Sequence, residues 1–478
     1  MFNKNNKVLF IIHDLYQEDN RFPLGPAYLA AVLNKNGAKV EAYCMDVFHY
    51  TNKDLARHLE ENEYDLIGVG FLAARFEETV RELCRVINAH KKNAWFILGG
   101  HGPSPIPEYM LRETEADLVV IGEAENTIVD LLSCKINNGG LASVPGIAYL
   151  DKGEYRYAGP ARIIKQLDEI PFPLWEIFPM EKYTTCSMMY NQEPEEKSFS
   201  VIAGRGCINR CNFCYRMEKG IRIRSNKNII EELQILNERY GVNCFFFEDE
   251  LFVFSKPRLK EFNTMLKEAG LKIKYLANAR VDIIDEELVG LLKETGCQFV
   301  NIGFESSSDK VLELMKKNAT REQNISAMEI ISKVGGIGMG LNFIWNNLGD
   351  TEESLKENVR LIKKYNTYYQ CRTIRPVTPY PGADLYYTLI EMGRISGPED
   401  FFKKFKNSDL IFENVMDMPL EKAYQCLIEA NTELIRDHYS HKGENAEEGE
   451  GLVRQLNELY SGKITKFRGT RHYNREEK

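Results

Sequence analysis

Three cysteines stand close together near the middle of the chain, in the run Cys207-Ile-Asn-Arg-Cys211-Asn-Phe-Cys214, directly after a strand-like segment over 199–204. Cysteine thiolates hold iron–sulfur clusters, and three local thiolates leave one iron of a four-iron cube open. An open coordination position is typical of a reactive metal site, whereas a structural site is closed. The aromatic Phe213 precedes the last cysteine and is expected to cover one side of the cube. The spacing therefore predicts a 4Fe–4S centre built for chemistry.

A zinc site is the alternative interpretation of these cysteines. Zinc prefers two CxxC-type pairs or a mixture of Cys and His, and the chain contains no second pair. The remaining eight of the eleven cysteines are scattered, mostly in apolar surroundings, and Cys244 and Cys297 are expected to be buried, inert thiols. This usage is typical of a reducing compartment, so we expect a cytoplasmic protein.

Length and charge narrow the possible classes of protein. The 478 residues are enough for two or three domains. The formal net charge of −9 argues against a nucleic-acid partner, which requires a clustered basic surface. The apolar run Val8–Ile12 is too short for a signal peptide, and no stretch is long enough to cross a bilayer.

Residues 1–150 alternate apolar strand-like runs with helix-like stretches. This alternation predicts a doubly wound, parallel, Rossmann-like α/β domain. Ligands in such sheets bind beyond the carboxyl ends of the strands, which here are glycine-rich at 98–104 and 121–125. The expected strands are 8–12, 40–43, 66–71, 95–98 and 118–121, and the expected helices are 26–36, 76–89 and 124–132.

Residues 151–195 are expected to form a linker, because several prolines there favour extended backbone. Strand–helix alternation resumes over 196–390, and its six repeats predict a partial parallel (β/α)6 barrel of the TIM type. Residues 391–478 are expected to form a small helical region with a mobile tail, including an acidic, glycine-rich break at 443–451. The expected barrel strands are 199–203, 244–247, 273–276, 299–304, 339–344 and 373–377.

Polar residues follow the later barrel strands, where such a barrel places its active site. Glu250, Arg280 and Glu305 could bind a zwitterionic amino acid, because carboxylates pair with ammonium groups and guanidinium groups pair with carboxylates. Asp249 is instead expected to face solvent.

These motifs resemble those of the radical S-adenosylmethionine (SAM) enzymes, whose signature is CxxxCx(aromatic)C. Phe247–Phe252 is similar to the family's FxDDxF segment, and Ile302–Ser306 matches its GxES segment. The resemblance implies that the open iron chelates SAM, that one electron then yields a 5′-deoxyadenosyl radical, and that Arg280 and Glu305 contact SAM. Glu250 departs from the pattern, and so does the turn Asn346–Gly349, where relatives have Gly-x-Pro-Gly.

The N-terminal half resembles the cobalamin-binding domain that is fused to one large radical SAM subgroup. The chain lacks the Asp-x-His-x-x-Gly motif that supplies an axial histidine in many cobalamin proteins, so cobalamin is expected to bind without a histidine ligand. The alternative is a vestigial domain that only covers the barrel. The resemblance implies cobalamin contacts at Leu24, Gly25, Gly99, Gly100, His101, Ser104, Gly122 and Glu123.

Together the two resemblances imply a cobalamin-dependent radical SAM methyltransferase that acts on an unactivated carbon of a small molecule. A reductase or flavodoxin-type protein is the expected electron donor. A radical SAM cyclase or rearrangement enzyme is the first alternative. A tRNA methylthiotransferase and a non-enzymatic iron–sulfur electron carrier or redox sensor are weaker alternatives.

Overall fold

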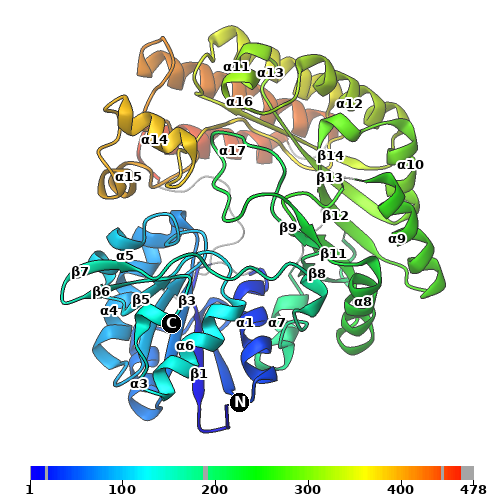
Figure 1. Cartoon of the computed structure of the whole chain (residues 1–478). Coiled ribbons are helices and arrows are strands. Elements are labelled where there is room, and N and C mark those ends of the chain that lie inside the picture. Colours follow the sequence, from blue (N-terminus) through cyan, green and yellow to red (C-terminus); the bar gives the residue numbers. More distant parts are fainter. Residues whose placement is uncertain (1, 17–19, 187–191, 254, 443–445, 465–478) are drawn as a thin grey trace.

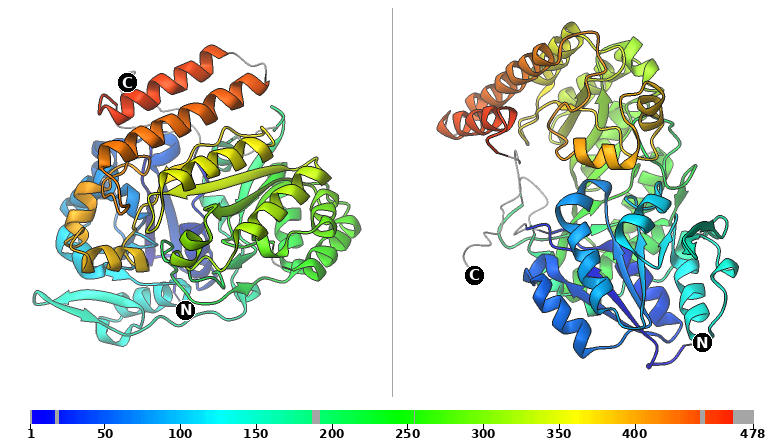
Figure 2. Two further views of the ribbon diagram at one scale, coloured as in Figure 1. Left: turned by 90° about the horizontal axis from the view of Figure 1, so that it is seen from above. Right: turned by 90° about the vertical axis from the view of Figure 1, so that its left-hand side faces the viewer.

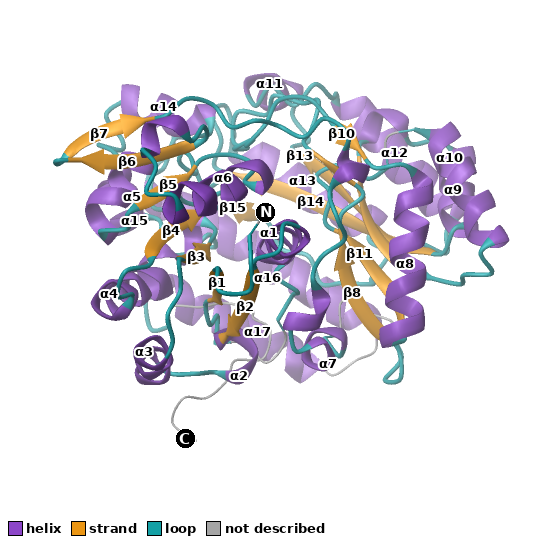
Figure 3. Cartoon of the chain, turned by 60° about the horizontal axis from the view of Figure 1, so that its bottom comes forward, coloured by secondary structure: helices purple, strands orange, loops and turns teal. Residues whose placement is uncertain are grey.

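The computed structural model describes residues 2–16, 20–186, 192–253, 255–442 and 446–464. Two sheets dominate the molecule, one from the N-terminal part of the chain and one from its middle (Figure 1). Helix α1 (Leu24–Lys35) lies between the two sheets (Figure 3).

The N-terminal sheet has seven strands in the order β2-β1-β3-β4-β5-β6-β7. Its first five strands are parallel, as the sequence predicts, and the order reverses at β1. A reversal of strand order marks the ligand-binding crevice of a doubly wound sheet. The parallel strands are β1 (Lys7–Ile12), β2 (Lys39–Cys44), β3 (Leu66–Gly70), β4 (Trp95–Gly99) and β5 (Leu118–Val120).

Helices connect these parallel strands. The predicted helix over 76–89 begins with a π-helical turn, Phe76–Val80, before it continues as α4. In α1, alanines at 27, 30 and 31 are buried, so this helix can pack closely between two layers. The helices are α1, α2 (Met45–Phe48), α3 (Asn52–Glu61), α4 (Arg81–His90), α5 (Pro107–Thr114) and α6 (Glu125–Ile136).

The N-terminal sheet extends past residue 150. Strands β6 (Ile147–Asp151) and β7 (Glu154–Tyr157) form a hairpin that adds two antiparallel strands to its edge. The next segment is an ordered connector, because Trp175, Phe178 and Tyr183 in and near α7 (Met180–Thr184) are buried.

The second sheet is an incomplete barrel of six parallel strands in the order β15-β14-β13-β12-β11-β8. All six lie where the sequence predicts strands, so the prediction of a partial barrel is confirmed. They are β8 (Lys197–Val201), β11 (Val242–Phe247), β12 (Lys274–Ala279), β13 (Cys297–Glu305), β14 (Gly338–Trp345) and β15 (Arg375–Pro376).

Helices cover the outer face of this sheet (Figure 1). Several begin at side chains that accept a hydrogen bond from the first turn, such as Ser225, Asp285 and Thr351. They are α8 (Asn226–Tyr240), α9 (Lys256–Glu268), α10 (Glu286–Glu294), α11 (Asp309–Leu314), α12 (Arg321–Val334) and α13 (Glu352–Tyr365).

The C-terminal helices belong to two different parts of the molecule. Helices α14 (Asp384–Glu391) and α15 (Pro398–Lys404) pack into an apolar cluster of the N-terminal domain. Helix α16 (Leu420–Lys442) packs beside α13 on the barrel, and α17 (Ala446–Tyr460) packs on α16 (Figure 2). The predicted break at 443–451 is wrong from Ala446 onward, where the chain is helical, and 443–445 lie outside the described residues.

One hydrophobic core joins the two halves. It combines Phe22, Leu24 and Tyr28 of the N-terminal domain with the buried faces of the barrel strands. In the described part of the chain, no helix combines the length and the apolar composition that a membrane crossing needs.

Candidate functional site

The three cysteines lie in a loop that a short ribbon closes. Strand β9 (Gly204–Arg205) pairs antiparallel with β10 (Arg222–Ile223), and residues 206–221 form the cysteine loop between them. This loop lies between the two sheets of the molecule (Figure 1). The cysteines are free thiols, and all three are partly exposed or exposed, whereas Cys244 and Cys297 are buried as predicted.

Backbone contacts from distant elements hold the cysteine loop in place. Asn212 donates its backbone N–H to the Met315 carbonyl over 2.9 Å, and its carbonyl accepts from Leu385 N at 2.7 Å. At the start of the loop, Gly206 N donates to the Glu250 carboxylate over 3.0 Å. The loop is therefore attached to α11, α14 and the end of β11 at once.

A cavity of about 230 Å³ opens beside the loop. The three cysteines line this cavity together with Phe213, Glu250, Arg280 and Glu305, the other residues that the sequence predicts to contact the cluster or SAM. Desolvation raises the pKa of Cys214 to about 11, and the nearby thiols of Cys211 and Cys207 add to this rise. Ligation there would release protons, because metals bind thiolates. The lining residues with polar, aromatic or sulfur groups include Cys207, Cys211, Phe213, Cys214, Glu250, Asn278, Arg280, Asn301, Glu305, Lys317 and Asn342.

Glu305 and Lys317 form an ion pair at this cavity that sequence reasoning missed. Lys317 Nζ donates to Glu305 Oε1 over 2.9 Å, and both side chains are largely buried. Burial acts to lower the pKa of Lys317, but Glu305 and the cysteines outweigh this effect and raise it. A Cβ at Gly303 would lie 2.1 Å from Glu305 Oε1, so only glycine there leaves room for the carboxylate.

Arg280 is fixed by partners on two sides. It donates Nε and Nη2 to the two oxygens of Asp282, each over 2.7 Å, and Nη1 to the side-chain oxygen of Asn209 in the cysteine loop. The hydrogen bonds with Asp282 are the main cause that raises the pKa of Arg280. This bidentate pair orients the guanidinium toward the loop.

Asp249 does not face solvent, so that expectation is wrong. Its side chain is buried and accepts a hydrogen bond from Ala203 N at 2.9 Å. Burial raises the pKa of Asp249 to about 7. The residue holds the end of β8 next to the ribbon, because Ala203 directly precedes Gly204. Its neighbour Glu250 is the one that lines the cavity.

A second cavity, of about 310 Å³, lies at the carboxyl edge of the N-terminal sheet and extends to the barrel. Gly25, Gly100, His101, Gly122 and Glu123, all predicted cobalamin contacts, line it.

Three other predicted contacts are not among its lining residues. Leu24 is buried in the core and Gly99 ends β4. Ser104 Oγ is 3.5 Å from the Val120 carbonyl and 3.4 Å from Gly122 N, so it joins the two loops beside the cavity.

The two cavities share a boundary. Gly206, Met217, Glu218 and Glu250 line both of them. Gly122 has a φ of +85°, and a Cβ there would approach the Glu218 carboxylate to 3.2 Å, so the N-terminal domain comes close to the cysteine loop at this point. Any molecule at this boundary would be accessible from both cavities.

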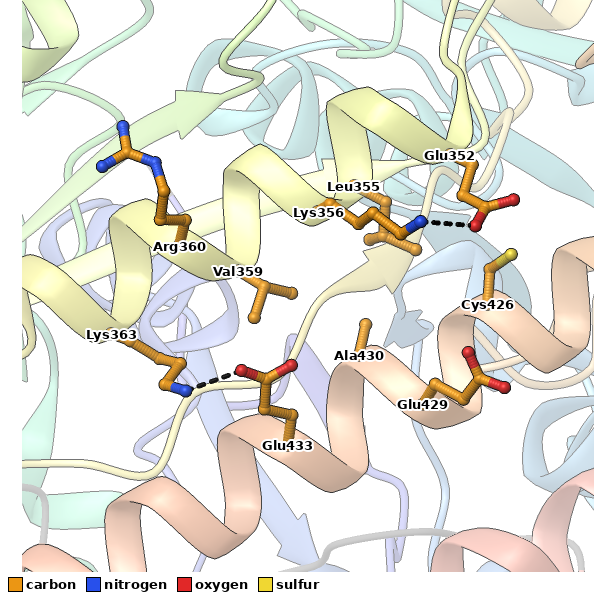
Figure 4. A pocket seen from close by; sticks show the side chains of 10 residues that line it. All are labelled: Glu352, Leu355, Lys356, Val359, Arg360, Lys363, Cys426, Glu429, Ala430 and Glu433. Carbon is orange, nitrogen blue, oxygen red and sulfur yellow. Dashed lines mark hydrogen bonds and ion pairs between the residues drawn. The ribbon is translucent and has the colours of Figure 1, made fainter.

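Other features of the described residues lie apart from this chemistry. A groove between α13 and α16 carries the ion pairs Glu352–Lys356 (2.7 Å) and Lys363–Glu433 (2.6 Å) (Figure 4). It contains no residue of the cysteine loop. In the part of the chain that is described, no group of three His, Cys, Asp or Glu side chains is arranged around a single ion.

The turn at Asn346–Gly349, which departs from the family pattern, keeps a conformation suited to glycine. Asn346 has a φ of +66°, which asparagine tolerates better than most residues. Its side chain donates to the Glu413 carbonyl over 2.9 Å, and its oxygen accepts from Val415 N at 3.2 Å. The asparagine thus attaches the C-terminal segment to the end of β14.

Comparisons with known proteins give matches to both halves. Residues 201–362 match the model of the radical SAM superfamily, and residues 19–132 match the model of the B12 binding domain. The cofactors of these domains, a 4Fe–4S cluster, SAM and cobalamin, are the ones that the sequence predicts.

Whole proteins of similar sequence include several methyltransferases. The chain is 29% identical to an uncharacterized methyltransferase of Pyrococcus horikoshii over 88% of this chain and 91% of that protein. It is 25% identical to cytidylyl-2-hydroxyethylphosphonate methyltransferase of Streptomyces wedmorensis over 80% of each. It is also 27% identical to anaerobic magnesium-protoporphyrin IX monomethyl ester cyclase of Rubrivivax gelatinosus, over 77% of this chain and 66% of the cyclase.

Solved structures share the fold. The cobalamin-dependent S-adenosylmethionine radical enzyme OxsB aligns with a TM-score of 0.70 at 20% identity, over 95% of this chain and 73% of OxsB. The radical SAM methyltransferase TsrM of Kitasatospora setae aligns with a TM-score of 0.65 at 18% identity, over 81% of this chain and 75% of TsrM. Both domain models match in the same order along one sequence, so the chain carries a B12 binding domain followed by a radical SAM domain.

Proposed function

We propose that this enzyme methylates an unactivated carbon of a small molecule, with cobalamin as the methyl carrier. The boundary shared by the two cavities carries this proposal, because a substrate placed beside Met217 and Glu218 lies within reach of both. When bound, the cluster and SAM supply a carbon radical that removes hydrogen, and cobalamin supplies the methyl group. The chain itself contributes binding, orientation and exclusion of water.

The residues around the smaller cavity fit the cluster and SAM. Cys207, Cys211 and Cys214 are free thiols on one loop and would hold the cluster. Arg280 and Lys317 would face the carboxylate of SAM, and Glu305 its ammonium group, because their charges are complementary. Glu305 already lies against Lys317, so the pair can separate slightly to receive both charged groups of one ligand.

Phe213 supports the exclusion of water from this cavity. Its ring is partly buried against the apolar cluster of the N-terminal domain and also lines the cavity. It therefore shields the cysteines on the side where the two domains meet. A dry site protects a carbon radical from side reactions.

The residues around the larger cavity fit a corrin. Gly25, Gly100 and Gly122 present backbone without side chains there, so a flat macrocycle can approach closely. His101 is the one histidine among the residues that line the cavity. Its ring stands edge-on to Tyr215 of the cysteine loop, with the centroids 6.0 Å apart. We assign it a contact with the corrin rather than ligation of cobalt.

The cluster that the cysteines would hold must also receive electrons from a partner protein. Ile208, next to Cys207, is 58% exposed, so this part of the cysteine loop reaches the surface. We propose that a reductase or flavodoxin-type protein docks there.

A cyclase or rearrangement enzyme is the second candidate. The similarity to the magnesium-protoporphyrin ester cyclase over 77% of this chain favours it. Both candidates form 5′-deoxyadenosine, but only a methyltransferase also forms S-adenosylhomocysteine in step with product.

The test is anaerobic purification with cluster reconstitution and added hydroxocobalamin, followed by turnover of SAM under a strong reductant. Retained corrin with both 5′-deoxyadenosine and S-adenosylhomocysteine supports the methyltransferase. Deoxyadenosine without corrin or S-adenosylhomocysteine contradicts it and leaves a plain radical SAM enzyme.

A matched pair of variants tests the cluster ligands. Cys211→Ala is expected to lose the bound iron and the formation of 5′-deoxyadenosine. Cys371→Ala removes an equally half-buried thiol outside the cavity and is expected to keep both. Equal iron content in the two variants would contradict the assignment.

A further inference from the structure

The ribbon at the base of the cysteine loop places two arginines directly opposite each other. Arg205 on β9 is the register partner of Arg222 on β10. Like charges in this position repel and weaken the pairing of strands. Each side chain is only 18% exposed, so water and salt screen the repulsion poorly. The ribbon therefore needs an anion between its arginines.

The N-terminal domain supplies that anion. Glu123 accepts hydrogen bonds from both terminal nitrogens of Arg222, and its Oε2 lies 3.2 Å from Arg205 Nη1. Glu125 accepts from Arg205 Nη2 at 2.6 Å. The carboxylates are 9% and 5% exposed. Two carboxylates thus balance two guanidinium groups in a largely buried interface, and both oxygens of Glu123 are occupied by arginine.

This charge cluster lies where the two cavities meet. Glu123, Glu125 and Arg205 line the larger cavity, and Gly206, which follows Arg205, lines both. Cys207 is the next residue. Arg205 therefore connects the two parts: its side chain pairs with the carboxylates beyond the N-terminal sheet, and its backbone leads through Gly206 to Cys207.

We propose that Glu123 and Glu125 are positioning residues that fix the distance between the cysteine loop and the carboxyl edge of the N-terminal sheet. They act through Arg205 and Arg222, and Glu123 is not a cobalamin ligand. The inference rests on the proposed function in one respect: the distance matters because two cofactors must reach one substrate. Truncating one partner of a buried charge pair leaves the other charge unpaired, so the interface should loosen when the carboxylates are neutralised.

The first experiment needs no cofactor, so its outcome does not depend on the proposed function. Hydrogen–deuterium exchange is compared between the parent protein and the variant Glu123→Gln/Glu125→Gln. Amides over 204–206 and 222–223 are expected to exchange at least about tenfold faster in the variant. The control is Glu113→Gln, which removes a 2.6 Å ion pair with Arg81 inside the N-terminal domain and should leave these amides unchanged. Unchanged exchange in the double variant would overturn the inference.

The second experiment measures the separation itself. Pulsed dipolar spectroscopy between the reduced cluster and cob(II)alamin is expected to give one narrow distance distribution in the parent and a broader or longer one in the variant. Identical distributions in two fully loaded proteins would refute the positioning role.

Arg222→Lys keeps the charge but loses the bidentate contact. If the double variant does not fold, Arg222→Lys is measured in its place. Its amide exchange and its distance distribution are expected to differ from those of the parent, but by less than is expected for the double variant. If it matches the parent in exchange and distance, the inference fails.

Discussion

Glu305 shows how a single residue is adapted to the site. Its φ is +62°, in the left-handed region that non-glycine residues rarely adopt, and it sits at a register shift between β13 and β14. Such conformations are costly and persist where the surrounding structure holds them. Here the ion pair with Lys317 and the space above Gly303 hold the carboxylate at the cavity.

Gly303→Ala is therefore expected to displace the Glu305 carboxylate, because the new Cβ would lie 2.1 Å from Oε1. We expect SAM affinity to fall by at least about tenfold, or about 1.4 kcal/mol, while iron content stays the same. Equilibrium binding of SAM to the reconstituted protein measures this. Gly290→Ala in α10 has open space around it and is the control, expected to stabilise slightly. Unaltered SAM binding by Gly303→Ala would show that Glu305 makes no contact with SAM.

The buried carboxyl group of Asp249 is expected to make the free energy of unfolding fall as the pH rises. Its pKa is raised from 3.8 to about 7 by burial, so the folded chain binds this proton more tightly than the unfolded chain. The stabilisation that this proton provides is complete below pH 3.8 and is lost as the pH rises to about 7. Over this range the free energy of unfolding falls by up to about 1.4 kcal/mol per pH unit. Asp249→Asn cannot ionise, so its free energy of unfolding should fall less than that of the parent between pH 5 and 8.

Chemical denaturation at several pH values measures that difference. Asp151→Asn, which replaces an exposed carboxylate at the end of β6, should follow the parent. If Asp249→Asn also follows the parent, the buried carboxylate does not carry the pH dependence.

At the scale of elements, α14 and α15 complete the core of a domain far from them in sequence. Phe402 stacks on Tyr109 with centroids 5.8 Å apart and contacts Phe76 at 4.9 Å. Leu385 of α14 also donates its N–H to the cysteine loop. These two helices thus link the N-terminal core to the cysteine loop, although the sequence does not reveal which domain their buried side chains complete.

Phe402→Ala should therefore destabilise the N-terminal domain, by about 3–5 kcal/mol for a buried phenylalanine. Thermal unfolding and corrin retention should both decline. Tyr387→Ala removes a neighbouring aromatic side chain that is 48% exposed and should change stability by less than about 0.5 kcal/mol. Equal effects of the two substitutions would argue against the packing role of α15.

At the scale of the whole molecule, the two domains are not separable units. The main core runs from Phe22 and Tyr28 into the barrel, and the N-terminal core includes Phe401 and Phe402. Ion pairs of Glu123 with Arg222 and of Glu125 with Arg205 also connect the N-terminal domain to the β9–β10 ribbon. The boundary between the cavities is therefore a product of the complete chain.

A fragment of residues 1–160 contains the whole seven-stranded sheet but lacks α14 and α15. We expect it to expose apolar surface, bind the dye ANS, and fail to retain hydroxocobalamin, because eight of the seventeen residues that line the cavity come from 202–250. A cooperative unfolding transition at the parent's midpoint, with corrin retained, would contradict this expectation.

The sequence by itself determined the parts that depend on local pattern. Apolar runs predicted all five parallel strands of the first sheet, because buried strands require such runs. The resumed alternation of strand and helix patterns predicted the six strands of the barrel. The cysteine spacing located the candidate cluster ligands, since three thiolates on one short loop must lie near each other. Positions at strand ends identified Glu250, Arg280 and Glu305, because parallel strands present their carboxyl ends at one edge.

Only the tertiary structure decided which distant groups meet. Lys317 follows a helix and resembles any surface lysine in sequence, yet it pairs with Glu305 at the cavity. Glu123 stands in a segment for which the sequence predicts a cobalamin contact, yet both its oxygens contact arginines of the β9–β10 ribbon. Lys317 and Glu305 are 12 residues apart, and Glu123 and Arg222 are 99 apart. In both cases the fold decides the pairing, because no local pattern encodes which partner a charged side chain will find.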